Sequence, residues 1–307
     1  MKTMSKMLFI VNHKAGKRGI KGSLNKILEL FNKAGYDVEY HPTKSANDAA
    51  DYVEKTKGAY DIIVCAGGDG TLDNTVSGLM KLREKGIKLP PLGYIPCGST
   101  NDYARSLKIS AKPIEAARDI VRGRACPVDV GTLGNTDFIY ITAFGLFTDI
   151  SYSTSQKLKN FLGHTAYIIT AVKCLFRIQT YRLKIEMDDK TVTGDFWYGQ
   201  VTNSRSVGGF RAIGVKEMSF CDGKYECLFI RKPKNPFQLV AILFSIATNK
   251  MNPKYICSEK ASKVRVLAKG PVPWTVDGEY GGTLKNVIIR NHKQAIDLVL
   301  AKDGGYM

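Results

Sequence analysis

The first 130 residues alternate between short strand-like runs and segments that place apolar residues at helical spacing. The run at 60–66 is apolar throughout, as expected of a parallel strand that is covered on both faces. Regular strand–helix alternation predicts a doubly wound parallel sheet, because each helix returns the chain to the same end of the sheet. The pattern predicts strands at 7–12, 37–41, 60–66 and 91–96, and helices at 24–35, 47–58 and about 72–85.

From about Asp129 the pattern changes. Strand-like runs dominate, and two helical segments interrupt them at 156–177 and 236–249. Many short strands bounded by turn residues are typical of antiparallel sheets, and the Asp188-Asp189 pair lies between two runs as a hairpin turn does. We therefore expect a second, mainly antiparallel β-sandwich domain.

The chain has 307 residues and 44% hydrophobic content, which is enough for a sizeable core and suggests about two domains. We expect an α/β domain over residues 1–128 and the β-sandwich domain over 129–294. The final apolar run, 295–301, is either the last strand of the sandwich or a strand by which residues 295–307 return to the first domain.

The net charge of +17 favours an anionic partner. Nucleic acid, membrane surfaces and phosphorylated small molecules all attract such a protein. The chain lacks a basic arm, zinc-finger spacing and an aromatic RNA-binding signature, so nucleic acid is disfavoured.

Cysteine usage and apolar run lengths bear on the location of the protein. Seven cysteines without a CxxC pair indicate reduced thiols in the cytoplasm. The apolar part of the N-terminus is too short for a signal peptide. The run at 239–247 is about half of the roughly 20 residues that a spanning helix needs. We expect no transmembrane segment and at most surface contact with lipid.

The first candidate site is the sequence GGDGT at 67–71, which follows the predicted strand 60–66 and opens a helix. Ligands bind at this edge of open α/β sheets, and the amides of a glycine-rich turn suit a phosphate group. Asp69 would repel that phosphate, so it either holds Mg²⁺ through water or fixes the loop. The alternative is a plain glycine turn with Thr71 as the N-cap. Neither GxxxxGK[ST] nor GxGxxG occurs.

Two more polar loops follow strands of the same predicted sheet. The loop at 95–105 offers Ser99 and Asn101, although Asn101 or Asp102 could simply cap the next helix. The loop at 12–19 has glycine and three cations, and its alternative is a solvated basic turn. Three such loops at one edge of a sheet together favour a phosphate site.

Near the C-terminus, the sequence VDGE places Asp277 and Glu279 two residues apart. Phosphoryl transfer to an alcohol needs positioning, charge neutralisation and a proton acceptor, and a carboxylate fits the last role. Spacing alone favours a hairpin turn with exposed acids, because D-G is a strong hairpin signal.

The chain resembles the diacylglycerol kinase catalytic-domain family over nearly its whole length. The resemblance rests on four motifs in this order: Asn12 and Gly16 after the first strand, GGDGT, GSTNDYAR and DGE. The bacterial soluble lipid kinases are the most similar sub-group. Sphingosine kinases share the pattern, and NAD kinases share GGDG. The resemblance implies an ATP- and Mg²⁺-dependent kinase of a lipid hydroxyl, with a cleft between an α/β domain and a β-sandwich.

The favoured reaction converts diacylglycerol to phosphatidic acid. The alternatives are a sphingoid base, a polyprenol or NAD as acceptor, or a non-catalytic protein that binds lipid or nucleotide. The resemblance also implies peripheral contact with an anionic membrane surface on its cytoplasmic side. The oligomeric state stays open, with a homodimer as one alternative.

The resemblance carries site residues over to this chain. Asp277 becomes the base with Glu279 as its partner, although the two could exchange roles. Asp222 and the carbonyls of Ser219 and Lys224 become a structural Mg²⁺ loop, whose oxygen ligands fit that cation. The nucleotide site comprises Asn12, Gly16, Thr43, Gly67, Gly68, Asp69, Gly70, Thr71, Asn74, Gly98, Ser99, Asn101 and Asp102.

The chain departs from the family pattern at two places. The first loop usually reads NPxSG, and here His13 and Ala15 replace proline and serine. After GGDGT the family usually has Asn-Glu, whereas this chain has Asp73 and Asn74. The second change moves a carboxylate by one residue, which puts its loop-fixing or Mg²⁺ role in question.

For lipid contact, the basic amphipathic segment 156–177 could lie at a membrane surface. It could equally be a helix packed on the sandwich. The segment RKPKNP at 231–236 is a second candidate, with a solvated loop as its alternative.

Overall fold

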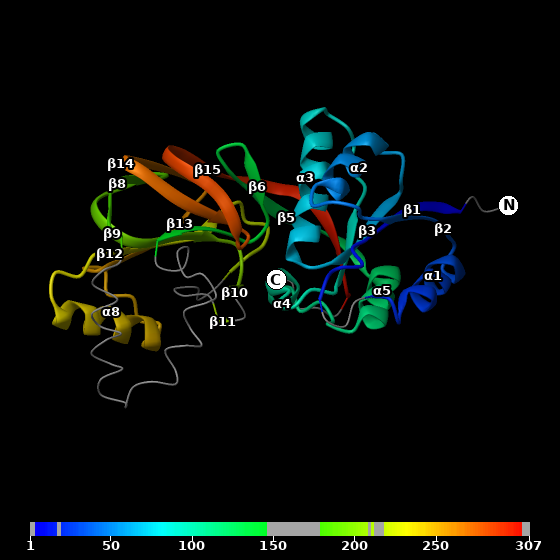
Figure 1. Cartoon of the computed structure of the whole chain (residues 1–307), viewed down its shortest axis with the longest axis horizontal. Helices are drawn as coiled ribbons and strands as arrows, with labels where there is room; N and C mark the ends of the chain where they lie inside the picture. Colours follow the sequence, from blue (N-terminus) through cyan, green and yellow to red (C-terminus); the bar gives the residue numbers. More distant parts are fainter. Residues whose placement is uncertain (1–3, 17–19, 146–178, 208–209, 212–217, 303–307) are drawn as a thin grey trace.

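The computed structural model describes residues 4–16, 20–145, 179–207, 210–211 and 218–302 (Figure 1). Its elements are β1 (Ser5–Val11), α1 (Leu24–Lys33), β2 (Tyr36–Pro42), α2 (Asp48–Thr56), β3 (Ile62–Gly67), α3 (Asp69–Glu84), β4 (Leu92–Pro96), α4 (Asp102–Ser106), α5 (Pro113–Arg122), β5 (Arg124–Leu133), β6 (Thr136–Phe138), β7 (Ile141–Gly145), β8 (Tyr181–Met187), β9 (Lys190–Thr202), β10 (Ser206–Val207), β11 (Phe210–Arg211), β12 (Tyr225–Arg231), α8 (Pro236–Thr248), β13 (Ile256–Ala261), β14 (Lys263–Val276) and β15 (Glu279–Leu300). The chain is a mixed α/β protein rich in strands.

The N-terminal part is a twisted parallel sheet between two pairs of helices (Figure 1). Its strand order is β2-β1-β3-β4, and all these pairs are parallel. Helices α2 and α3 pack together on one face, and α1 and α5 pack together on the other. The carboxyl ends of β1, β3 and β4 therefore meet at one edge of the sheet.

Alternation along the buried strands explains why both faces need cover. On β1, Leu8 and Ile10 join the apolar cluster under α2 and α3. Met7, Phe9 and Val11 join the cluster that contains α1 and α5. Side chains of a strand point to opposite faces in turn, so an all-apolar strand is stable only inside two helical layers.

The C-terminal part is built from antiparallel strands that curve around a second apolar core (Figure 1). Strand β14 pairs with β7, β8 and β15, and β9 pairs with β7, β8 and β12. The hydrogen-bonded path β14-β8-β9-β7-β14 is therefore closed. Phe144, Phe196, Phe229 and Trp274 fill its interior and contact one another edge-on or stacked.

Strand β15 joins both parts of the molecule. Its first half pairs with β14, and its second half pairs antiparallel with β5 and, through Leu298 and Leu92, parallel with β4. The last predicted strand, 295–301, is thus the end of a 22-residue strand and lies beside the N-terminal sheet.

Two sequence predictions are corrected. The helix predicted from about residue 72 begins at Asp69, and Thr71 is not its N-cap, because Gly68 occupies that position. The glycine turn is therefore already the first turn of α3. The predicted helix 236–249 is α8, whereas the segment 156–177 lies outside the described residues.

Candidate active site

Three loops meet at the strand ends through glycine. A Cβ added at Gly16 would lie 2.1 Å from the Cys97 carbonyl oxygen, and the φ of Gly16 is +66°. A Cβ at Gly98 would lie 2.6 Å from the Cα of Gly68. The Cys97 N–H donates to the Gly67 carbonyl at 2.7 Å. Backbone packs on backbone here, so no larger residue fits at these positions.

Asn12 ties the first loop to α3. Its Nδ2 donates to Thr71 Oγ1 at 3.0 Å, and its Oδ1 accepts from the Lys14 N–H at 3.0 Å. Thr43 follows β2 and donates its N–H to the Val11 carbonyl at 2.9 Å. These bonds place the first loop and the end of β2 beside the start of α3.

A pocket of about 380 Å³ opens between these loops. It lies at the N-terminus of α3, where the helix dipole and free amides favour an anion. Among the residues predicted for the site, its lining contains Asn12, Gly16, Thr43, Gly68, Gly70, Thr71, Asn74, Gly98 and Glu279.

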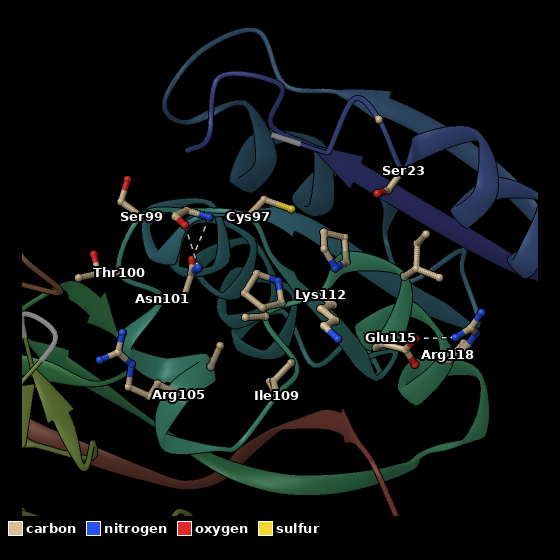
Figure 2. A pocket seen from close by; sticks show the side chains of 17 residues that line it. Ser23, Cys97, Ser99, Thr100, Asn101, Arg105, Ile109, Lys112, Glu115 and Arg118 are labelled. Carbon is tan, nitrogen blue, oxygen red and sulfur yellow. Dashed lines mark hydrogen bonds and ion pairs between the residues drawn. The ribbon is translucent and has the colours of Figure 1, made fainter. Parts of the chain in front are cut away.

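A larger pocket, of about 940 Å³, lies on the other side of the 97–101 loop and shares Gly98 with the first (Figure 2). Ser99 and Asn101 line this second pocket. Asn101 is left-handed (φ 49°), and its side chain exchanges two hydrogen bonds of 2.9 Å with the backbone of Gly98. Charged side chains in the lining are Arg105, Lys112, Glu115 and Arg118 (Figure 2).

Asp69 and Asp102 lie behind the loops and line neither pocket. Asp69 Oδ2 accepts from the Asp102 N–H at 3.0 Å, which links α3 to α4. Asp69 Oδ1 is buried and has no hydrogen-bond partner. Burial raises the pKa of Asp69. An unpaired buried carboxylate oxygen is a ligand of the kind that a hydrated Mg²⁺ takes.

Asp277 is buried in the β14–β15 turn at a positive φ of 48°. Its carboxylate accepts three backbone hydrogen bonds, from Ile139 at 2.6 Å, Tyr140 at 3.0 Å and Ile141 at 2.9 Å. Burial raises the pKa of Asp277 to about 6, and the three amides oppose that rise. The side chain fixes the segment that enters β7.

Asp73 lies on α3, and its carboxyl group interacts with that of Asp277. Burial and then the charge of Asp277 raise the pKa of Asp73 well above its usual range. Two buried carboxyl groups in contact share a proton, because both cannot be charged together. A protonated Asp73 donates to Asp277 as an asparagine amide would, and asparagine is the usual family residue at this position.

Glu279 has a different environment from Asp277. Its side chain lines the pocket of about 380 Å³ at the N-terminus of α3, and Oε1 lies 3.4 Å from where a Cβ at Gly70 would be. The residue is exposed. Of the two predicted catalytic acids, Glu279 therefore reaches the pocket, and Asp277 lies beneath it.

The predicted metal loop lies elsewhere, and Ser219, Asp222 and Lys224 line neither pocket. Asp222 Oδ1 accepts from the Lys224 N–H at 2.9 Å, and Oδ2 lies 3.7 Å from the Lys260 ammonium. Within the described part of the chain, no three His, Cys, Asp or Glu side chains gather as a metal site. The loop supplies one carboxylate and backbone carbonyls.

Sequence reasoning missed the loop's main support, Asp129, which is buried. Its Oδ2 accepts from Gly223 N–H at 2.7 Å and from Asn291 Nδ2 at 3.1 Å, and its Oδ1 accepts from Gln294 N–H at 2.8 Å. Burial raises the pKa of Asp129, which these hydrogen bonds oppose. A lone aspartate at the start of an apolar run was the only signal in the sequence.

Comparison with known proteins agrees with the motifs. Residues 6–133 match the family described as "Diacylglycerol kinase catalytic domain". The chain is 32% identical to a diacylglycerol kinase of Bacillus subtilis over 98% of both chains. The chain belongs to the diacylglycerol kinase family. The resemblance drawn from the motifs is thus confirmed, and the protein is a lipid kinase by family.

Other members of the family show the same extent of similarity. The diacylglycerol kinase of Staphylococcus carnosus is 32% identical over 96% of this chain and 94% of its own. A crystal structure of a diacylglycerol kinase from Bacillus anthracis has a TM-score of 0.76 and 22% identity, and covers 99% of this chain and all of its own. That structure shows that the fold is shared.

Proposed function

We propose that this kinase transfers the γ-phosphoryl group of ATP to the hydroxyl of diacylglycerol and so forms phosphatidic acid. The observation that carries the proposal is the pocket at the N-terminus of α3, where three glycine-containing loops and Glu279 converge. The names of the relatives support the lipid acceptor. The glycine-rich loops come first in the sequence and the acidic VDGE turn comes last, and this order of motifs is the one that resembles the kinase family.

The glycine loops would bind the phosphates of ATP. Missing side chains at Gly68, Gly70 and Gly98 let phosphate oxygens approach the backbone, and the α3 N-terminus adds a favourable dipole. Asn12 and Thr43 line the same pocket and are suited to the rest of the nucleotide. Positioning and charge stabilisation are the main contributions that a protein makes to phosphoryl transfer.

Mg²⁺ would neutralise charge on the phosphates when bound. Asp69 would hold it through water, because its Oδ1 is buried and unpaired. A second Mg²⁺, with a structural role, would bind at the 219–224 loop. The Lys260 ammonium lies 3.7 Å from Asp222 Oδ2, so a bound cation would have to displace this lysine.

The acceptor proton needs a carboxylate that faces the pocket. Glu279 meets this requirement, whereas three amides and Asp73 hold Asp277. The geometry favours Glu279 as the base and Asp277 as its positioning partner. The resemblance suggested the opposite roles, with Asp277 as the base and Glu279 as its partner, and an exchange of roles as the alternative.

We further propose that residues 1–128 and 129–294 act as nucleotide and lipid domains, with the end of β15 returning to the first. Strand β15 contributes Glu279 at one end and pairs with β4 at the other, which supports this division. We place the enzyme at the cytoplasmic face of the membrane. In the described residues no helix is both long and apolar enough to span a bilayer.

The test is transfer of labelled γ-phosphate from ATP to a lipid panel in mixed micelles with Mg²⁺. The panel contains diacylglycerol, monoacylglycerol, a sphingoid base and a polyprenol, with NAD as the soluble acceptor. We expect label in phosphatidic acid. Label in another product would change the acceptor, and bound ATP without label in any product would overturn the kinase proposal for this panel.

A further inference from the structure

Helix α8 carries an exposed apolar face. Of the six exposed large apolar side chains in the described residues, four lie on it, namely Phe237 (85% exposed), Val240 (64%), Leu243 (47%) and Phe244 (67%). The other two lie elsewhere, Met4 just before β1 and Tyr280 on β15. A contiguous exposed apolar patch on one element indicates an interaction surface rather than scattered surface residues.

The geometry of α8 separates this face from the core. Leu239, Ile242 and Ser245 are buried, and the leucine and isoleucine join the apolar cluster that includes β12. At 3.6 residues per turn, the four exposed side chains fall on the opposite side of the helix. The helix has no charged residue. A surface helix of a globular protein normally presents polar residues on its outer face, so α8 is an exception that needs an explanation.

The charges beside α8 select the partner. From Cys227 to Ser258 the chain has no aspartate or glutamate. Exposed lysines flank both ends of the helix, Lys232 and Lys234 before it and Lys250 and Lys254 after it. An apolar face with a cationic rim and no acid matches an anionic bilayer. A second copy of the same basic patch would bring like charges together.

The position of α8 is compatible with surface contact. It connects β12 to β13 at the end of the molecule farthest from β1 and β2 (Figure 1). Asn235 caps its first turn by accepting from the Gln238 N–H at 3.0 Å, and Pro236 occupies the first helical position. The Asn235 cap and Pro236 thus fix where the helix begins.

We infer that the outer face of α8, with its flanking lysines, is a docking surface that inserts into an anionic phospholipid bilayer. The inference rests on the proposed function, since it explains how a lipid acceptor comes within reach. It assigns the contact to Phe237, Val240, Leu243 and Phe244. These residues lie outside the motifs that identified the family.

The first test is binding to vesicles of phosphatidylcholine with one-third phosphatidylglycerol, measured by co-sedimentation without ATP. Phe237→Ser with Phe244→Ser should weaken partitioning at least about tenfold, because each phenylalanine loses its apolar burial. Met4→Ser is the control, because it removes an exposed apolar side chain that is far from α8 in the sequence, and it should leave binding unchanged. Equal binding of the double variant and the wild type would overturn the inference.

Charge and depth provide independent readouts. Lys232→Glu with Lys250→Glu should lower binding to the anionic vesicles, by about fivefold for each lysine removed, with little change on pure phosphatidylcholine. In a Phe244→Trp variant, the emission of the introduced indole should shift to the blue on vesicle addition, with quenching by brominated acyl chains. An emission spectrum of this variant that vesicles do not change would contradict insertion.

Two controls separate the alternatives. Activity on a short-chain diacylglycerol dissolved in buffer should be equal in the wild type and the Phe237/Phe244 variant, whereas activity on vesicles should fall. If the wild type phosphorylates neither substrate, the proposed function fails while the binding result still decides the role of α8. If sedimentation velocity shows that the variant changes the oligomeric state and vesicle binding is retained, the face is a contact between copies of this chain.

Discussion

The pocket at the strand ends has a glycine-rich side and an acidic side. The glycine-rich side consists of backbone held against backbone, with Gly16 on Cys97 and Gly68 on Gly98. The acidic side consists of Glu279, which lines the pocket, and of the buried Asp73–Asp277 pair, which does not line it. The packing of the glycine-rich side depends on shape, so any added atom disrupts it. The role of each acid depends on its protonation state, so replacing a carboxylate by an amide of the same shape reveals what that acid does.

The first prediction concerns the glycine-rich side. Gly98→Ala would place a methyl group 2.6 Å from the Cα of Gly68, so the loops must separate. A misplacement on the order of 1 Å costs about 10²-fold, and we expect a loss of this size in kcat/KM for ATP. Gly270→Ala is the matched control, because nothing lies within 4 Å of its added Cβ. An unchanged kcat/KM in Gly98→Ala would contradict the tight loop contact.

The acidic side gives the second effect. Glu279→Gln should lower kcat by about 10²–10⁴-fold, the range for a positioned base, with the unfolding midpoint unchanged. Asp277→Asn should instead lower the free energy of unfolding by about 1–3 kcal/mol, because backbone donors at Ile139 and Tyr140 lose a charged acceptor. Kinetics and urea unfolding of both variants check this. A stable Asp277→Asn protein with the larger loss of kcat would return the base role to Asp277.

The Asp73–Asp277 pair gives the third effect, a change in pH dependence. The folded protein keeps protons on this pair that the unfolded chain releases above about pH 4, so the free energy of unfolding falls as pH rises. A pKa of about 6 at Asp277 corresponds to about 3 kcal/mol lost between pH 4 and 7. Asp73→Asn supplies an amide donor in place of the carboxyl group whose pKa is raised, so it removes one of the two titrating groups and should flatten that decline.

Urea unfolding at pH 5 and pH 8 measures the difference. The exposed Asp37→Asn is the control, since it removes a carboxylate without touching the pair. If Asp73→Asn and the wild type lose the same stability between the two pH values, the carboxyl pair does not share a proton.

The smallest effect concerns the 219–224 loop. Millimolar Mg²⁺ without nucleotide should raise the free energy of unfolding of the wild type by about 1 kcal/mol through mass action, and Asp222→Asn should remove the rise. Calorimetry with Ca²⁺ and Mg²⁺ in parallel measures it. A wild type indifferent to Mg²⁺ would leave Asp222 as the partner of Lys224 and Lys260 alone.

Local signals predicted much of this molecule. The apolar runs located β1 to β4, and the glycine turns located the loops that meet at the sheet edge, because parallel strands share that edge. The start of α3 was wrong, since glycine is a poor helix former but a good N-cap at Gly68. The contact between Asp73 and Asp277 joins residues far apart in sequence, and only the folded chain brings them together.

The same limit applies to α8. Its apolar composition predicted a helix, but composition does not say which side a neighbouring strand covers. Leu239 and Phe244 look equivalent in the sequence, yet one is buried and the other is exposed. The environment of each acid in VDGE is likewise set by distant segments, the backbone at 139–141 for Asp277 and the turn at Gly70 for Glu279.

Strand β15 has a consequence for synthesis on the ribosome. Its end pairs with β4 and β5, so the N-terminal sheet lacks its neighbouring strand until the residues up to Leu300 have emerged. Until then, the edge of the sheet at β4 stays open in the nascent protein. Closure of that edge and delivery of Glu279 to the glycine loops depend on the same strand, so a chain that ends before β15 would have neither a complete sheet nor the acid that lines the pocket.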